Sequence, residues 1–228
     1  MTPGRLPLAR VSTTEAVVNE LRSQILDGTL EPGTHLREIE LSERFGVSRQ
    51  SLRASLVELV HLGLLRREAH RGVWVATLTR RDIRDLYLMR EILETEAVRR
   101  LAANRAAWPA VETAVGRLER LPARAPWSQV VDADIEIHHA IVEAVGSPRM
   151  TRAHGLLGTE MRLSVVPARR YVSRAAMIEL HRELLDAIRT GDPDQAAARF
   201  REHLAFGSED LLAALPEDTH ENTPDGVG

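Results

Sequence analysis

One continuous run, residues 32–75, constrains what this chain can fold into more than any other feature. The apolar pattern of Glu40–Phe45 predicts a short helix. Gly46 follows at once, and glycine is the residue that most readily takes the left-handed conformation at a helix end. Ser48 can cap a second helix over Arg49–Leu62, because its hydroxyl accepts a hydrogen bond from a free backbone N–H of the first turn. Two helices joined by so short a turn indicate a helix-turn-helix.

The rest of the run predicts a β-hairpin after the second helix. Leu65–Arg67 and Val73–Val75 have the pattern of two short strands, and Glu68–Gly72 would form the turn between them. Residues 44–71 also hold six Arg against two acidic residues. Ordinary solvated charges on a small α+β domain are the alternative interpretation. The order of turn, cap and hairpin favours instead a winged helix-turn-helix, with three helices and a small β-hairpin, over residues 13–76.

A helix-turn-helix makes double-stranded DNA the first partner to consider. The N-terminal end of its second helix enters the major groove, where Arg and Gln can bond base edges. Arg49, Gln50 and Arg53 lie at or near that end, and we expect them to read bases. Arg44, Arg71 and His70 would hold phosphates or reach the minor groove. The predicted DNA-binding residues are Arg44, Ser48, Arg49, Gln50, Arg53, His70, Arg71 and Gly72.

The run resembles the DNA-binding domain of the GntR family of bacterial transcription regulators over about 60 residues. After its Ser-Arg pair the family usually continues Thr-Pro-Val-Arg-Glu-Ala-Leu. This chain has Ser51 and Ala54 in place of that Pro and Glu, so the resemblance implies the fold but no particular operator sequence. The residues that carry the resemblance are Pro32, Gly33, Leu36, Glu38, Leu41, Phe45, Gly46, Val47, Ser48, Arg49, Arg53, Leu56, Gly63, Leu64, Arg71 and Gly72.

Composition excludes several classes of function. Cysteine is absent, which removes disulfides, cysteine-based zinc sites and thiol catalysis. Lysine is absent too, all 30 basic residues being Arg, so neither a pyridoxal phosphate Schiff base nor a Walker-type phosphate loop can form. No apolar stretch reaches the ~18 residues of a membrane span, and residues 1–12 lack the apolar core of a secretory signal. We therefore expect a cytoplasmic protein with no membrane partner.

Charge is divided unevenly along the chain. Residues 1–80 carry 11 Arg and 9 acidic residues, a net charge of +2. Residues 81–228 carry 19 Arg and 24 acidic residues, a net charge of −5. General coating of nucleic acid by the whole molecule is therefore not expected. DNA binding should come from a local basic patch and should weaken with salt as counterions are released.

After a short linker, residues 77–80, the sequence is helical in pattern. Val and Ile recur at helical rather than alternating spacing, and Gly-Ser-Pro and Gly-Asp-Pro turns separate the segments. Residues 81–215 therefore predict an all-α antiparallel bundle of about six helices, in a chain that is mainly α. We expect a flexible arm over residues 1–12 and a disordered acidic tail over residues 216–228. The expected helices span residues 81–105, 109–121, 128–145, 148–165, 174–190 and 193–214.

Histidines carry the chemistry of this second domain. Asp134 and His138 are four residues apart, so their side chains share one helix face. His181 and His203 lie among apolar residues of two later helices and should also point into the bundle. Three imidazoles and a carboxylate suit a divalent metal, with zinc preferred and nickel, iron or manganese as alternatives. Because only Asp134 and His138 are locally paired, hydrogen-bonded core histidines remain the other interpretation of the spacing.

Residues 134–146 resemble the helix that carries an Asp and a His in the FCD effector-binding domain, the usual partner of the winged helix in the FadR subfamily of GntR regulators. His181 and His203 match the positions of the other two ligands. The resemblance implies a metal held by all four side chains, and a small organic-acid effector whose carboxylate the metal binds. Many members carry an Arg where this chain has Arg90, which would clamp that carboxylate as an effector-binding residue. A surface Arg90–Glu94 pair is the alternative.

These features predict a ligand-responsive transcription regulator, expected to be a repressor, that is not an enzyme. Two chains would dimerise so that two winged helices contact the half-sites of a near-palindromic operator. A metal-dependent hydrolase with an attached DNA-binding domain is the alternative. It is disfavoured because the chain lacks the His-Asp, His-Glu-x-x-His and Gly-x-Ser-x-Gly motifs of hydrolases. A third option is an architectural DNA binder with a vestigial effector pocket, against which the complete ligand set argues.

Overall fold

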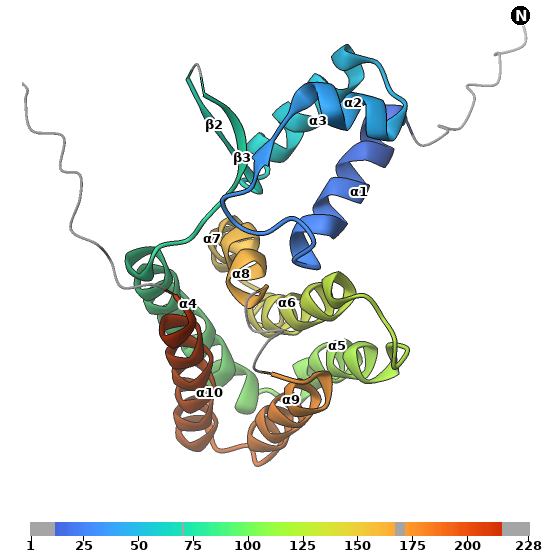
Figure 1. Cartoon of the computed structure of the whole chain (residues 1–228). Helices are drawn as coiled ribbons and strands as arrows, with labels where there is room; N and C mark the ends of the chain where they lie inside the picture. Colours follow the sequence, from blue (N-terminus) through green and yellow to red (C-terminus); the bar gives the residue numbers. More distant parts are fainter. Residues whose placement is uncertain (1–11, 70, 167–171, 216–228) are drawn as a thin grey trace, which may run out of the picture. The chain divides into compact units, whose positions relative to one another are not determined.

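The computed structural model describes residues 12–69, 71–166 and 172–215, and it divides the chain into two compact units that meet between Thr77 and Leu78 (Figure 1). The arm over residues 1–12 falls almost wholly outside the described residues, and the tail over residues 216–228 does so completely. Over the described residues, no helix is both long and apolar enough to span a membrane.

The N-terminal unit is a winged helix-turn-helix, as the sequence predicts. Its sheet is antiparallel in the order β1-β3-β2, with His35 opposite Trp74 and Leu65 opposite Val75. The two-residue strand β1 was not predicted, since so short a segment shows no alternating pattern. The elements are α1 (Thr13–Leu26), β1 (His35–Leu36), α2 (Glu38–Phe45), α3 (Arg49–His61), β2 (Leu65–Glu68) and β3 (Gly72–Val75).

Local signals place α3 as expected. Gly46 ends α2 in the left-handed conformation with φ 62°, and Ser48 caps α3 by accepting a hydrogen bond from the Ser51 backbone N–H at 3.1 Å. Leu52 and Leu56 on the inner face of α3 are fully buried. This packing holds the N-terminal end of α3 at the surface, where it is available to a partner.

The C-terminal unit is an all-helical bundle (Figure 1). Helix α4 packs chiefly on α10, and α5 packs on α6. Helix α6 is the most enclosed of them, with Ile137 and Ile141 fully buried. Four helices, α4, α6, α9 and α10, supply the polar residues of the site described below. The helices are α4 (Arg80–Ala102), α5 (Trp108–Arg120), α6 (Trp127–Glu143), α7 (Pro148–Leu156), α8 (Gly158–Val165), α9 (Arg174–Arg189) and α10 (Pro193–Ala214).

Two of the predicted helices differ from the structure by more than two residues. The helix expected over residues 148–165 is two helices, α7 and α8, which break at Leu157 between Gly155 and Gly158. Glycine costs about 1 kcal/mol in a helix relative to alanine, so two of them weaken this segment. The first bundle helix ends at Ala102 rather than at residue 105, and the 3₁₀ turn Arg105–Ala107 follows it.

Candidate nucleic-acid interface and metal centre

The exposed end of α3 carries the residues predicted to read bases. Arg49 and Gln50 are exposed in its first turn. Arg53 is also exposed, but its Nε donates a hydrogen bond to Glu38 Oε2 at 2.7 Å. In this structure Arg53 therefore contacts the first turn of α2, and it would have to leave Glu38 to reach a base edge. Exposed pairs of this kind contribute little stability, so that exchange costs little.

The wing presents further basic residues. Arg71 is exposed, with its Nη1 3.5 Å from Glu68 Oε2. Gly72 has φ 103°, and a Cβ at this position would lie 2.5 Å from His35 Nε2. That histidine stacks on Trp74 with ring centroids 4.4 Å apart, so only glycine fits where the wing turns back. The predicted wing contact His70 lies outside the described residues.

Arg44 lies on α2, away from the wing. Its side chain is exposed, its Nη2 lies 3.4 Å from Gln24 Oε1, and its guanidinium is 5.8 Å from the Phe45 ring centre. These contacts leave donors of the guanidinium facing solvent, as a phosphate contact requires.

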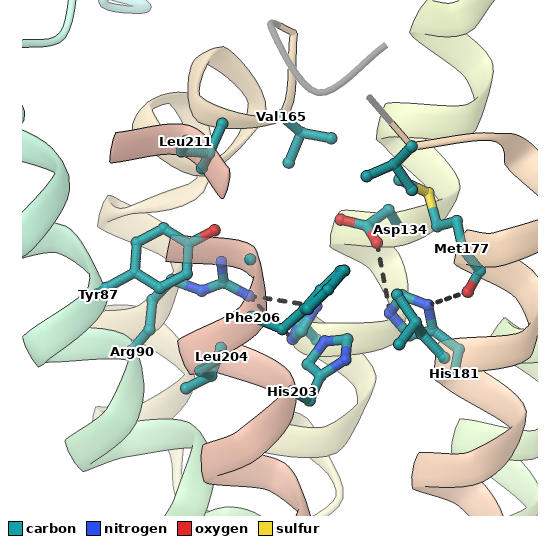
Figure 2. Close-up of a pocket in the computed structure, with 14 residues that line it drawn as sticks. Tyr87, Arg90, Asp134, Val165, Met177, His181, His203, Leu204, Phe206 and Leu211 are labelled. Atoms are coloured by element: carbon teal, nitrogen blue, oxygen red, sulfur yellow. Dashed lines mark hydrogen bonds and ion pairs between the residues drawn. The ribbon is translucent and has the colours of Figure 1, made fainter. Parts of the chain in front are cut away.

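In the bundle, three predicted ligands come together from three helices. His138 on α6, His181 on α9 and His203 on α10 each offer a ring nitrogen, and these three nitrogens lie within 4.8 Å of one another (Figure 2). His138 and His181 are buried, and His203 is half-buried. Asp134, one turn before His138, is buried beside them, with its Oδ1 3.3 Å from His181 Nε2. The structure thus brings together all four residues that the sequence singled out.

Hydrogen bonding leaves acceptor atoms facing each other in this cluster. His181 Nδ1 must donate to the Met177 carbonyl at 2.8 Å, because a carbonyl oxygen only accepts. In the neutral ring, His181 Nε2 then carries a lone pair that faces the Asp134 carboxylate. Among the described residues, His181 Nε2 and His203 Nδ1 are buried without a hydrogen-bond partner. The lone pair of His181 Nε2 facing a carboxylate is costly unless a cation lies between them, so these residues fit a metal.

Burial also sets the protonation of the two histidines. It lowers the pKa of His181 below its ordinary value, although Asp134 opposes the shift. Burial lowers the pKa of His203 well below its ordinary value, and the neighbouring His181 adds to the effect. Both imidazoles are therefore neutral near pH 7, the form that binds a metal.

Glu94 on α4 is a site residue that the sequence analysis missed as such. Its fully buried carboxylate accepts from Arg90 Nε at 3.0 Å, and it lies 2.8 Å from both His138 Nδ1 and His154 Nε2. Burial alone would raise the pKa of Glu94, but Arg90 and His138 outweigh it and hold that pKa well below its usual range. Since the ionised carboxylate only accepts, His138 Nδ1 is the donor, and the ring lone pair is on Nε2, which Arg90 Nη2 faces at 3.2 Å.

A sequence signal for this arrangement exists. Helix α4 buries residues at the i+3 and i+4 spacing of a single stripe, and Arg90 and Glu94 fall on that stripe rather than on the polar face. The alternative prediction of a surface Arg90–Glu94 pair was therefore wrong: the pair forms, but it is buried. His154, which had no partner pattern in the sequence, is buried on α7. The buried stripe of α4 therefore indicates that Glu94 is buried. Only the fold shows that His154 contacts its carboxylate.

Arg90 lines the same site. Its Nη2 lies 3.2 Å from both ring nitrogens of His138, and its guanidinium is 4.8 Å from the Tyr87 ring centre. Burial would lower the pKa of Arg90, but Glu94 more than compensates and raises it, so the side chain stays charged. Arg90 thus gives the pocket a fixed positive charge, part of which Glu94 already neutralises.

The cluster lies at one side of a pocket of about 580 Å³, part of it open to solvent. In Figure 2, Val165 and Leu211 lie on one side of this pocket and His203 on the other. The described lining residues are Tyr87, Arg90, Asp134, His138, Val165, Val172, Met177, Leu180, His181, His203, Leu204, Phe206, Gly207 and Leu211.

Comparisons with known proteins agree with both halves of this description. Residues 13–75 match the family described as bacterial regulatory proteins, gntR family. Residues 85–206, more than half of the chain, match the FCD domain. The chain belongs to the GntR family. As a GntR regulator with an FCD domain, it is a DNA-binding transcription regulator and not an enzyme, and members of this family are usually dimers.

Individual relatives span nearly the whole of this GntR protein. A probable D-xylose utilization operon transcriptional repressor of Paenarthrobacter nicotinovorans is 29% identical over 218 residues, covering 94% of this chain and 92% of the relative. The uncharacterized HTH-type transcriptional regulator BphR of Paraburkholderia xenovorans (strain LB400) is 31% identical over 215 residues, covering 87% and 85%. The solved structure of a transcriptional regulator assigned to GntR from Rhodococcus sp. RHA1 superposes with a TM-score of 0.71 at 27% identity, covering 89% of this chain and 99% of that one.

Proposed function

We propose that this GntR regulator is a dimeric repressor whose operator affinity is set by a small organic acid bound at a divalent-metal site in the FCD domain. The site consists of Asp134, His138, His181 and His203. One observation carries the proposal: a buried carboxylate oxygen and buried, unpartnered imidazole nitrogens face one another. The repressor sense follows the description of the Paenarthrobacter relative.

The protein's own residues prepare this site in three ways. The Met177 carbonyl accepts from His181 Nδ1 and so holds its Nε2 toward the cluster. Glu94 accepts from His138 Nδ1, so that this ring also carries its proton on Nδ1 and its lone pair on Nε2. The low pKa of His203 keeps its ring neutral. A bound divalent cation supplies a Lewis-acidic positive charge for the carboxylate of an effector, and its nitrogen and oxygen donor set suits zinc, nickel, iron or manganese.

Arg90 adds a second positive group beside the cluster. It remains charged, and it faces His138 at 3.2 Å. An incoming carboxylate would therefore meet the guanidinium as well as the cation, in the manner of a clamp. Glu94 and His138 already engage Arg90 Nε and Nη2, so the effector would share the guanidinium with them.

The three histidines come from helices α6, α9 and α10. Ligand binding at their meeting point therefore acts on the packing of three helices at once. In a dimer this would shift the pose of the two winged helices and change operator affinity by a coupling free energy of about 1–3 kcal/mol. Arg49 and Gln50 would read the half-sites of a near-palindromic operator, and Arg44 and Arg71 would hold its backbone.

The test begins with metal content by mass spectrometry on the purified full chain. We expect about one metal per chain in the wild type and none in His138→Ala/His203→Ala. His139→Ala is the matched control, because His139 is next to His138 but has no place in the cluster. Operator binding is then measured with and without a panel of organic acids. Operator affinity that no acid changes, in protein that holds its metal, would instead support an architectural DNA binder.

A further inference from the structure

The chemistry of the pocket wall points to the class of acid that this site takes, an inference that rests on the function proposed above. We infer that the effector is a monocarboxylate with an apolar body, such as an aryl-substituted or branched aliphatic acid, rather than a polyhydroxylated sugar acid. Its carboxylate would lie at the histidine side of the pocket, and its body against Val165, Val172, Met177 and Leu211.

Few polar side chains line the pocket outside the histidine cluster, as far as the structure describes its lining. Among the described lining residues, six carry a polar side chain, and four of these form the ligand cluster. Arg90 is paired with Glu94 and faces the cluster. The Tyr87 hydroxyl is the one polar group left among these residues, and it lies within hydrogen-bonding reach of Ser164. Over the described residues, the wall away from the histidines therefore offers a ligand almost no hydrogen-bond partners from side chains.

The backbone of the described lining residues does not make up this shortage. Among the described lining residues, all but Val172 lie within helices, where most N–H and C=O groups already bond to one another. A sugar acid such as gluconate would bring five hydroxyl groups into this wall. Each hydroxyl that loses water without gaining a partner lowers affinity by roughly tenfold. An apolar body loses nothing of this kind, and it gains from leaving water.

Gly207 packs closely against Tyr87 in this wall. A Cβ at Gly207 would lie 3.1 Å from the Tyr87 hydroxyl, tighter than an ordinary contact. The absence of a side chain there lets the Tyr87 ring lie over Arg90, at 4.8 Å from its guanidinium. The ring thus forms a flat apolar face beside the charged end of the pocket, which suits a planar or branched body.

The experiment compares two acids of equal charge by titration calorimetry on the zinc-loaded full chain. Phenylacetate is the apolar probe and gluconate the polyhydroxylated one. We expect phenylacetate to bind at least about tenfold more tightly. Tighter binding of gluconate would overturn the inference and leave the proposed function standing. If neither acid binds to protein that holds its metal, the inference is refuted, and the proposed function is decided separately by the operator assay with the panel of acids.

A pair of variants tests the wall itself. Val165→Thr and Val172→Thr each add a hydroxyl at nearly constant volume, and each should weaken phenylacetate binding by roughly threefold or more while leaving gluconate binding equal or tighter. Val111→Thr on α5, buried outside the pocket, is the matched control and should change neither affinity. Val172 is half-buried and outside the helices, so its variant keeps the test decisive if Val165→Thr fails to fold. Equal phenylacetate binding in all three variants would overturn the inference.

Discussion

Replacing the buried carboxylate of Glu94 by an amide, Glu94→Gln, should destabilise the bundle and weaken metal binding together. The side chain keeps its shape but loses the charge that balances Arg90 at 3.0 Å. Leaving one member of a buried ion pair uncompensated costs about 3–5 kcal/mol. For a chain of this size that corresponds to a fall in melting temperature of roughly 6–20 °C, measured on the metal-free protein by circular dichroism.

The same change should act on His138 through its tautomer. Glutamine can offer an N–H where glutamate offers only acceptors, so His138 Nδ1 would no longer be required to donate at this 2.8 Å contact. Rings whose supporting hydrogen bond is removed typically lose about 10- to 100-fold in metal affinity. Competition with a zinc chelator measures this loss directly.

Glu96→Gln is the matched control on the same helix. Glu96 forms an i,i+4 pair with Arg100 at 2.7 Å, but both side chains are substantially exposed. Such a pair is worth only about 0.3–0.5 kcal/mol, so this variant should melt within a degree or two of the wild type. If Glu94→Gln melts like Glu96→Gln, the reasoning from burial is refuted. If it melts early but keeps full zinc affinity, only the argument about the His138 tautomer fails.

Three further predictions concern both units. Arg49→Ala should cost about 1–3 kcal/mol of operator binding and relax one base position; an equal loss on all sequences in a binding-site selection would show a phosphate contact instead. Gly72→Ala should destabilise the N-terminal unit by roughly 1–3 kcal/mol in a denaturant titration, since φ is 103° and a Cβ would meet His35. The metal-free protein should lose stability as pH falls below about 6.5. Folding lowers the pKa of His181 and His203, so in that pH range the unfolded chain binds more protons than the folded one. Thermal melts from pH 8 to pH 5 that show no such slope would contradict it.

Those features that depend on a few neighbouring residues could be read from the sequence. Gly46 and Ser48 define the helix-turn-helix, because a helix end and a helix cap are decided within one turn of the chain. The i+4 spacing of Asp134 and His138 likewise places two proposed ligands on one face of a single helix. Their apolar neighbours made His181 and His203 candidate ligands, but that pattern also suited ordinary core histidines, and the resemblance to the FCD domain favoured the metal site.

Only the tertiary structure decided which distant groups meet. The i+4 spacing of Arg90 and Glu94 predicts a local pair. Packing of α4 against α6 and α7 buries this pair and brings His138 and His154 to the Glu94 carboxylate. Exposed Arg53 meets Glu38 across 15 residues for the same reason, because the turn brings α3 back onto α2. Periodicity reports which face of a helix is buried, and it contains no information about the partner that buries it. The proposed ligands could therefore be named from the sequence, whereas the groups that orient them could be found only in the fold.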